Sequence, residues 1–215
     1  MTRDELKNLL LSLKEEDFYN SVDLHIHSYE SDGKMSPCEI VKQAKERNLK
    51  YIAIADHNTV EAYISTNILA EEIVIPAVEF DCYYKGNLLH ILGYGIDIDN
   101  ENLKSLYSKT KAGRRKNIVR LLNLRTPEEV IDKIKEAGGI PIWAHPACCW
   151  TRSLEEMLQD LIVRGLEGIE VYYPYNELRG LLKFHSKEYI KELADKYKLI
   201  KTGGTDSHGE SLLIN

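Results

Sequence analysis

Residues 22–27 read Val-Asp-Leu-His-Ile-His, and the predicted fold builds outward from this stretch. Residues 22–26 form a short apolar run of the kind that makes a buried strand. A helix signal follows at Ser36, which offers an N-cap before Pro37 and a capping-box glutamate at Glu39. This part of the chain therefore predicts one strand followed by one helix.

The alternation of strand and helix signals continues to the end of the chain. Thr126, Pro127 and Glu129 give a second capping box, and Ser153 opens a further helix. Strands that alternate with helices are typical of a parallel α/β fold. The predicted strands lie at residues 22–26, 51–55, 73–78, 88–92, 140–144, 168–172 and 199–202.

Length and composition indicate one globular domain. The chain has 215 residues, of which 43% are hydrophobic and 29% charged, so one well-buried core is expected. We expect a single domain over residues 1–215, with its motifs within residues 21–209. Residues 97–125 are polar and predict a short helical segment.

The charge pattern narrows the partners. Lys and Arg number 28 against 34 Asp and Glu, a net charge of -6, which disfavours duplex nucleic acid as a partner. A small phosphorylated substrate or a nucleic-acid end fits better. No run approaches the roughly 20 apolar residues of a membrane-spanning helix, so a cytoplasmic protein without a membrane partner is expected.

Histidines gather at the ends of the predicted strands. Six of the seven sit beside acidic or glycine residues at these ends, a placement that packing does not explain. His25 and His27 are two apart, so on a strand both imidazoles point to the same side and can share one ion. The six are His25, His27, His57, His90, His145 and His208.

Carboxylates follow the same strand ends. Asp32 lies on a turn after the first strand, Glu79 closes the run 73–78, and Asp206 follows the last strand. Strand ends on the C-terminal side build the active sites of α/β barrels, so these groups should meet the histidines. For Asp32 a turn-forming role is the alternative to a ligand role.

Imidazole with carboxylate suits zinc, manganese or iron, and the four cysteines lack the spacing of a structural zinc knot. The ligands outnumber the needs of one ion, so two or three divalent ions are expected, with a carboxylate such as Glu79 as a bridge. Clustered ions lower the pKa of a bound water toward about 7 and stabilise both oxygens of a displacement at phosphorus. A metal-bound hydroxide attacking a phosphoester is the predicted chemistry.

Six ordered motifs over residues 21–209 resemble the PHP (polymerase and histidinol phosphatase) family of metal-dependent phosphoesterases. Together they make a specific signal, although each alone is weak. They are Asp23-Leu-His-Ile-His-Ser28 with Ser31-Asp-Gly33, Ala55-Asp-His-Asn-Thr59, Ala77-Val-Glu-Phe80, Leu89-His-Ile-Leu-Gly-Tyr94, Ala144-His-Pro146 and Gly204-Thr-Asp-Ser-His-Gly209.

The resemblance implies a distorted (β/α)7 barrel with a trinuclear metal site. The matching positions would divide into three ligand sets, two of which share Glu79. They are His25, His27, Glu79 and Asp206 for one ion, Glu79, His90 and His145 for another, and Asp32, His57 and His208 for the third.

The stretch Leu89–Asp97 is similar to the branch of nucleoside 3',5'-bisphosphate phosphatases and RNA 5'-end exonucleases, although their helical insertion is missing here. The resemblance implies a phosphatase acting on a phosphomonoester, with a nucleotide such as a 3',5'-bisphosphate or AMP as the expected substrate. A histidinol-phosphate phosphatase, a 5'-3' exonuclease and a non-catalytic metal-stabilised scaffold are the alternatives.

Three arginines are candidates for binding the substrate phosphate, because a planar guanidinium binds phosphate oxygens in a bidentate fork. Arg152 is seven residues past His145, in the loop that leaves a ligand-bearing strand. Arg114 and Arg115 lie in the local basic stretch. For each arginine, an ordinary surface position is the alternative.

Overall fold

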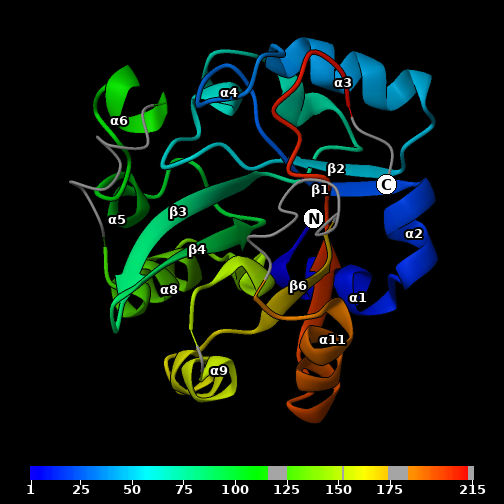
Figure 1. Ribbon diagram of the computed structural model, residues 1–215. Coiled ribbons are helices and arrows are strands. Elements are labelled where there is room, and N and C mark those ends of the chain that lie inside the picture. Colours follow the sequence, from blue (N-terminus) through cyan, green and yellow to red (C-terminus); the bar gives the residue numbers. More distant parts are fainter. Residues whose placement is uncertain (116–124, 152, 174–183, 213–215) are drawn as a thin grey trace.

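The computed structural model describes residues 1–115, 125–151, 153–173 and 184–212. Helices lie around the outside of the strands, with α3 above them and α9 and α11 below in Figure 1. The elements in chain order are α1 Arg3–Ser12, α2 Glu15–Asn20, β1 Val22–Ile26, α3 Pro37–Glu46, β2 Tyr51–Ile54, α4 Glu61–Ile64, the 3-10 turn η1 Ile68–Ala70, β3 Ala77–Tyr84, β4 Asn87–Tyr94, α5 Glu101–Lys104, α6 Lys111–Arg115, α8 Pro127–Glu136, β5 Ile140–Ala144, the 3-10 turn η2 Pro146–Cys148, α9 Leu154–Val163, β6 Gly168–Tyr172, α11 Lys187–Lys196 and β7 Ile200–Gly203.

The predicted helix starts are confirmed. Helix α3 begins at Pro37, where the Ser36 hydroxyl accepts from the Glu39 N–H (3.2 Å) and the Glu39 carboxylate accepts from the Ser36 N–H (2.8 Å). Helix α8 begins at Pro127 under a Thr126 cap. Of that second capping box, the described contacts include the hydroxyl's bond from the Glu129 N–H and not the reciprocal one.

The strands form two sheets. Strands β1 and β2 pair in parallel, and the second sheet has the order β3-β4-β5-β6-β7. Within it β5, β6 and β7 are parallel, whereas β4 runs antiparallel to both β3 and β5. The purely parallel sheet predicted from the sequence is therefore wrong. Lys85 and Gly86, with φ of 47° and 83°, make a two-residue turn between β3 and β4, too short for a parallel crossover.

The third predicted strand is also displaced. Residues 73–78 were expected to form it, but β3 begins at Ala77 and Val74 makes only an isolated bridge to Ile52. Pro76, which has no backbone N–H to give to a ladder, directly precedes the strand. Glu79 is consequently the third residue of β3 and not a residue beyond its end.

Isolated bridges connect the two sheets at both sides. Ile26, the last residue of β1, bridges to Ser207 beyond β7, and His57 beyond β2 bridges to Glu79 in β3. An α/β fold is thus confirmed. A closed (β/α)7 barrel, like the single-domain boundaries, stays a prediction, and residues 116–124 of the expected helical segment lie outside the described residues.

Apolar side chains from strands and helices fill the interior. Helix α8 buries Val130, Ile131 and Ile134, each worth about 1.5–3 kcal/mol when fully buried. The helix lies so close to the sheet that a Cβ at Gly93 would come within 2.9 Å of Ile134. This packing fixes β4, and with it His90.

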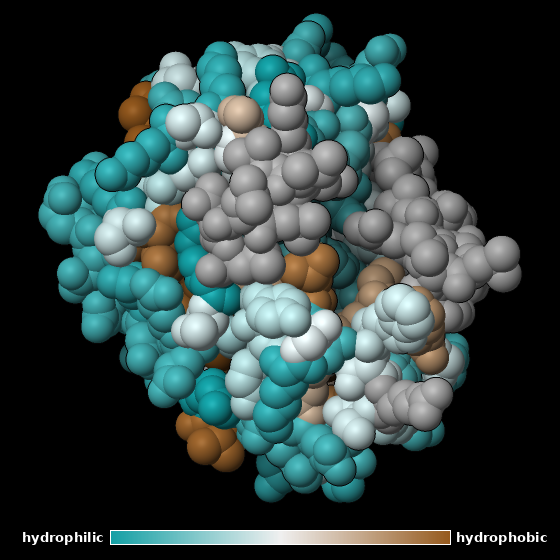
Figure 2. All heavy atoms as spheres, turned by 60° about the vertical axis from the view of Figure 1, so that its left-hand side comes forward, coloured by the Kyte–Doolittle hydropathy of each residue, from teal (hydrophilic) through white to brown (hydrophobic). Residues whose placement is uncertain are grey.

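The face shown in Figure 2 is largely hydrophilic, with hydrophobic side chains scattered over it in small patches. Within the described residues, none of the helices has the length and apolarity needed to cross a membrane.

Candidate metal centre

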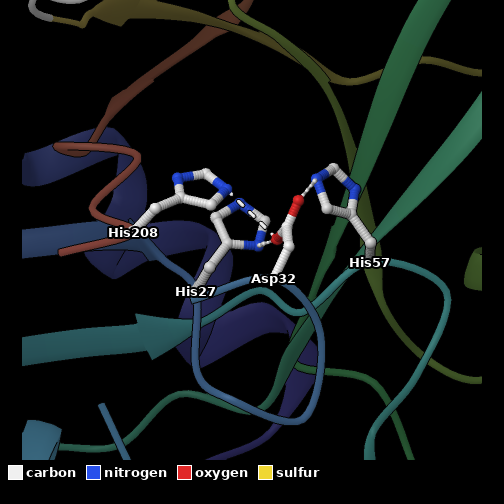
Figure 3. A group of neighbouring side chains, drawn as sticks. All are labelled: His27, Asp32, His57 and His208. Atoms are coloured by element: carbon white, nitrogen blue, oxygen red, sulfur yellow. Dashed lines mark ion pairs between the residues drawn. The ribbon is translucent and has the colours of Figure 1, made fainter. Parts of the chain in front are cut away.

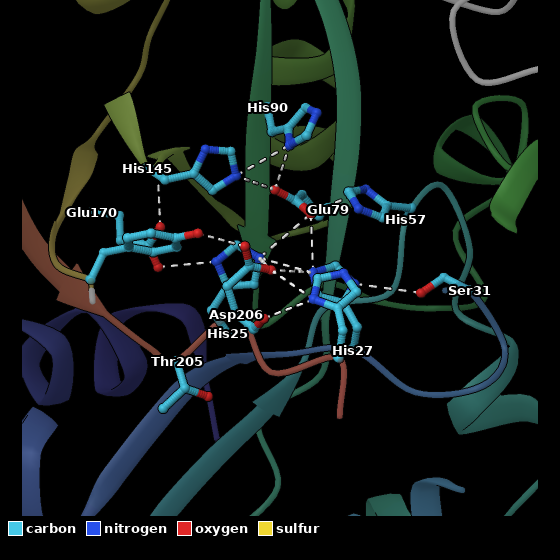
Figure 4. A network of polar contacts seen from close by, with 12 residues as sticks. His25, His27, Ser31, His57, Glu79, His90, His145, Glu170, Thr205 and Asp206 are labelled. Carbon is cyan, nitrogen blue, oxygen red and sulfur yellow. Dashed lines mark hydrogen bonds and ion pairs between the residues drawn. The ribbon is translucent and has the colours of Figure 1, made fainter. Parts of the chain in front are cut away.

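The structure brings all nine predicted ligand residues together (Figures 3 and 4). His25 lies in β1 and His27 directly after it, and Glu79 and His90 lie in β3 and β4. His57 and His145 follow the ends of β2 and β5, while Asp32, Asp206 and His208 lie in loops. The histidines and carboxylates that the sequence analysis placed at the strand ends therefore converge on one place.

The first cluster contains His25, His27, Glu79 and Asp206. The Nε2 atoms of the two histidines lie 3.2 Å apart. Asp206 Oδ1 lies 3.0 Å from His27 Nε2 and 3.6 Å from His25 Nε2, and Glu79 Oε2 lies 3.3 and 3.4 Å from the same two atoms. All four side chains point at one another and are buried.

The second cluster contains Glu79, His90 and His145. Glu79 Oε1 lies 2.8 Å from His90 Nδ1 and 3.1 Å from His145 Nε2. The two imidazole nitrogens are 3.2 Å apart. Glu79 thus presents one oxygen to each of the first two clusters, as a bridging carboxylate would.

The third cluster contains Asp32, His57 and His208, and His27 joins it (Figure 3). Asp32 Oδ1 lies 3.1 Å from His208 Nε2 and 3.7 Å from His27 Nδ1, and its Oδ2 lies 3.7 Å from His57 Nε2. The His27 ring stacks between those of His57 and His208, at 4.5 and 4.2 Å. His27 therefore faces the first cluster with Nε2 and the third with Nδ1.

The spacing of these atoms fits metal ligation. Two ligand atoms on one tetrahedral zinc ion, each about 2.0–2.1 Å from it, are about 3.3 Å apart. Among the described residues, the buried Glu79 Oε2 has no hydrogen-bond partner. It nevertheless lies within 3.1–3.4 Å of nitrogens of His57, His25 and His27. A buried oxygen that is surrounded but unsatisfied is what an ion among these groups would resolve.

The electrostatics show how strongly the cluster attracts positive charge. Burial opposes charge on His27, yet neighbouring carboxylates raise its pKa to about 10. Burial opposes charge on His90 too, and Glu79 and Asp81 raise its pKa to about 9. Burial would raise the pKa of Glu79, but the surrounding imidazoles hold it well below its usual range. Without metal, the site therefore holds protons where cations could bind.

Four further buried carboxylates, to which the sequence prediction gave no role in the site, hold the candidate ligands. Asp81 Oδ1 lies 3.1 Å from His90 Nε2, and Glu170 Oε1 lies 3.0 Å from His25 Nδ1. Asp23 accepts from the backbone N–H of Thr205 (2.9 Å), beside Asp206. Asp56 accepts from Ser28 and Ser31, in the loop that leads to Asp32. Their signal is a carboxylate within or directly beside an apolar run.

The structure describes two of the three predicted phosphate-binding arginines, Arg114 and Arg115. Arg114 Nε donates to the Ser108 carbonyl (3.1 Å), and its terminal nitrogens lie 3.5 Å from Glu61 Oε2. Arg115 is exposed at the end of α6. Arg152 lies outside the described residues.

The fold agrees with comparisons to known proteins. The family model described as PHP domain matches residues 23–201, which is most of the chain. The protein therefore belongs to the PHP domain family, as its motifs predicted. Named relatives are phosphoesterases, which supports the predicted hydrolase class.

Two relatives differ in how much of their length the chain covers. A 5'-3' exoribonuclease of Haemophilus influenzae is 33% identical over 119 residues, which are 54% of this chain and 40% of the relative. Phosphoribosyl 1,2-cyclic phosphate 1,2-diphosphodiesterase of Eggerthella lenta is 25% identical over 87% of this chain and 94% of the relative. The chain thus spans less than half of that exoribonuclease and nearly all of the diphosphodiesterase.

Solved structures show the same fold. A Bifidobacterium adolescentis protein assigned as a metal-dependent phosphoesterase has a TM-score of 0.73 at 22% identity, covering 91% of this chain and 90% of that one. A Chromobacterium violaceum amidohydrolase has a TM-score of 0.69 at 21% identity, covering 88% of each chain.

Proposed function

We propose that the protein hydrolyses a phosphomonoester at a centre of two or three divalent metal ions, manganese, zinc or iron. The observation that carries this proposal is the position of Glu79, whose two oxygens face two clusters of imidazole nitrogens. The proposed ligands are those of the three clusters, with Glu79 as the bridge and His27 between the first and the third.

The ions, when bound, supply an activated water and neutralise charge on the phosphoryl oxygens. The candidate ligands of the three clusters differ in how far their side chains are exposed to solvent. The side chains of His25 and Glu79 are 0% and 1% exposed, whereas those of His90, Asp32 and His208 are 22%, 21% and 36% exposed. A substrate would therefore reach the centre past the second and third clusters, with the first cluster shielded from water.

Substrate phosphate is proposed to contact Arg152 and one of Arg114 and Arg115. Arg114 supports this role through its location in the fold, because its partner Glu61 begins helix α4 only a few residues after His57. The Arg114 side chain is only 14% exposed. Its contacts with Glu61 and with the Ser108 carbonyl fix the orientation of the guanidinium before substrate binds. A preoriented fork loses less side-chain entropy when it binds phosphate.

A nucleotide is the proposed substrate class. Trp150 and Phe184 are 80% and 43% exposed, and their rings stack at 5.7 Å with an interplanar angle of 3°. Trp150 is five residues beyond His145, which limits their separation to about 18 Å. Phe184 N–H donates to the carbonyl of Ala147 in the same loop (2.9 Å). An exposed aromatic platform near a phosphate site suits a nucleobase.

A cyclic phosphodiester is the second candidate substrate. It is favoured by the coverage of the Eggerthella lenta diphosphodiesterase, 94% of whose length matches, against 40–55% for the exoribonucleases. A 3',5'-nucleoside bisphosphate phosphatase of Chromobacterium violaceum, 30% identical over 97 residues, supports the monoester.

A substrate panel assayed with added manganese separates these possibilities. We expect phosphate release from nucleoside 3',5'-bisphosphates or AMP to exceed release from histidinol phosphate. Release of nucleotides from RNA would favour the exonuclease, and ring opening without phosphate release would favour the cyclic diester. A metal-loaded protein that leaves every compound intact would refute the phosphoesterase proposal and favour a metal-stabilised scaffold.

A further inference from the structure

We infer that Glu170 is a positioning residue that holds one ligand of the first metal cluster, His25, and one ligand of the second, His145. It lies in the middle of β6, is 0% exposed, and uses each of its two oxygens on a different candidate ligand. Oε1 lies 3.0 Å from His25 Nδ1, and Oε2 accepts from the backbone N–H of His145 at 2.8 Å. This inference rests on the proposed metal centre but not on its substrate.

The contact with His25 sets which nitrogen is free for an ion. A carboxylate can only accept, so His25 Nδ1 carries the proton that it donates to Glu170. His25 Nε2 is then left bare in the neutral ring, and this is the atom that faces His27, Glu79 and Asp206. A carboxylate behind an imidazole in this way orients the ring and strengthens it as a ligand.

The contact with His145 holds an unusual backbone. His145 has φ 29° and ψ 55°, in the left-handed region that non-glycine residues seldom adopt. The bond to Glu170 fixes the amide of this residue at the end of β5. From that backbone the side chain reaches Glu79 Oε1 at 3.1 Å and His90 Nδ1 at 3.2 Å.

The placement of Glu170 explains the role of β6 in the centre. None of the nine candidate ligands lies on β6, although it runs between β5, which ends directly before His145, and β7, which precedes Asp206. Glu170 is the contribution of this strand. Glu170 contacts the imidazole ring of His25 and the backbone N–H of His145, so one carboxylate couples the first and second clusters.

Asp81 provides a matched comparison. It is also a buried carboxylate behind a candidate ligand, with Oδ1 3.1 Å from His90 Nε2. Its Oδ2 accepts from the Asn58 side chain, and Oδ1 lies 3.6 Å from His57 Nδ1, which is beyond hydrogen-bond range. Substitution of Asp81 should therefore weaken chiefly the ion at His90, whereas substitution of Glu170 should weaken two ions.

The experiment measures cobalt binding to the metal-free wild type, Glu170→Gln and Asp81→Asn by chelator competition and by the cobalt d–d absorption. The glutamine side chain has a single accepting oxygen, so it can accept from only one of the two donors, and its NH2 group would face the other. We expect affinity to fall by about 10–100-fold for two ions in Glu170→Gln and for one in Asp81→Asn. Wild-type affinities and spectrum in a folded Glu170→Gln protein would overturn the inference.

A second measurement does not require the variant to fold. In the zinc-loaded wild type, 15N chemical shifts of the histidine rings report which nitrogen carries the proton. The inference requires His25 to be protonated at Nδ1 and ligated at Nε2, and the opposite pattern would overturn it. A wild type that binds ions as expected but hydrolyses no phosphoester would refute the proposed function and leave the role of Glu170 intact.

Discussion

Glu79 Oε2 faces His27 Nε2 at 3.3 Å, yet within the described part of the chain it accepts no hydrogen bond. That separation is close to the spacing of two ligands on one ion. Glu79 therefore lies where one carboxylate could bridge two ions.

Glu79→Gln should lower kcat/KM by at least about 100-fold, because one amide cannot serve as an anionic bridge between two clusters. Metal analysis should show the loss of at least one ion per chain. His185→Ala is the control for metal content, since this imidazole contacts the Thr151 carbonyl at 2.8 Å and lies outside the three clusters. Equal metal content in Glu79→Gln and His185→Ala would speak against the bridge.

The metal-free protein should lose stability as the pH rises from 7 to 10. The pKa values of His27 and His90 are raised to about 10 and about 9 from 6.5, so their protons stabilise the fold fully below pH 6.5. That contribution is lost as the pH rises through 9 and 10, and Tm should fall by on the order of 5 °C. Thermal melts with bound metal should lack this loss. If the Tm of the metal-free protein rises between pH 7 and pH 10, the raised pKa values of His27 and His90 are contradicted.

Metal uptake at pH 7 should release protons, because ions displace them from His27 and His90. A pH indicator in weak buffer measures the release during a manganese titration. Competition from protons should also make activity fall below about pH 6, and at a higher pH when metal is scarce. Uptake without proton release at pH 7 would show that these rings are already neutral.

Arg152→Ala should leave the metal content unchanged and lower kcat/KM by ten-fold or more, about 1.4 kcal/mol of transition-state binding. Arg152→Lys should recover part of the loss, since a lysine lacks the bidentate fork. Arg114→Ala tests the second proposed contact in the same assay. Unchanged kinetics in either alanine variant would remove that arginine from the site.

Trp150→Ala should raise KM for a nucleotide several-fold and leave KM for a non-aromatic phosphomonoester, such as glycerol phosphate, unchanged. The physical reason is the loss of base stacking on an exposed ring. An equal change for both substrates would argue for a structural role of Trp150 in its loop, and no change would argue against the platform.

The nine candidate ligands could be predicted because polar residues at the ends of apolar runs are conspicuous. The antiparallel β3–β4 hairpin could have been predicted from Lys85-Gly86 between two apolar runs, but the alternating pattern elsewhere favoured parallel strands. That His27 faces two clusters could not be predicted, because it depends on how the ring stacks between His57 and His208. Glu170 gave a weak signal, a single carboxylate inside the run Gly168–Tyr172.

The metal content of the reconstituted protein tests the central claim most directly. Metal-free protein is incubated with manganese, zinc or iron, freed of excess ion by gel filtration, and assayed by elemental analysis. The account predicts two or three ions per chain, and a loss of ions in Glu79→Gln. Fewer than one ion per chain with every metal offered would contradict it.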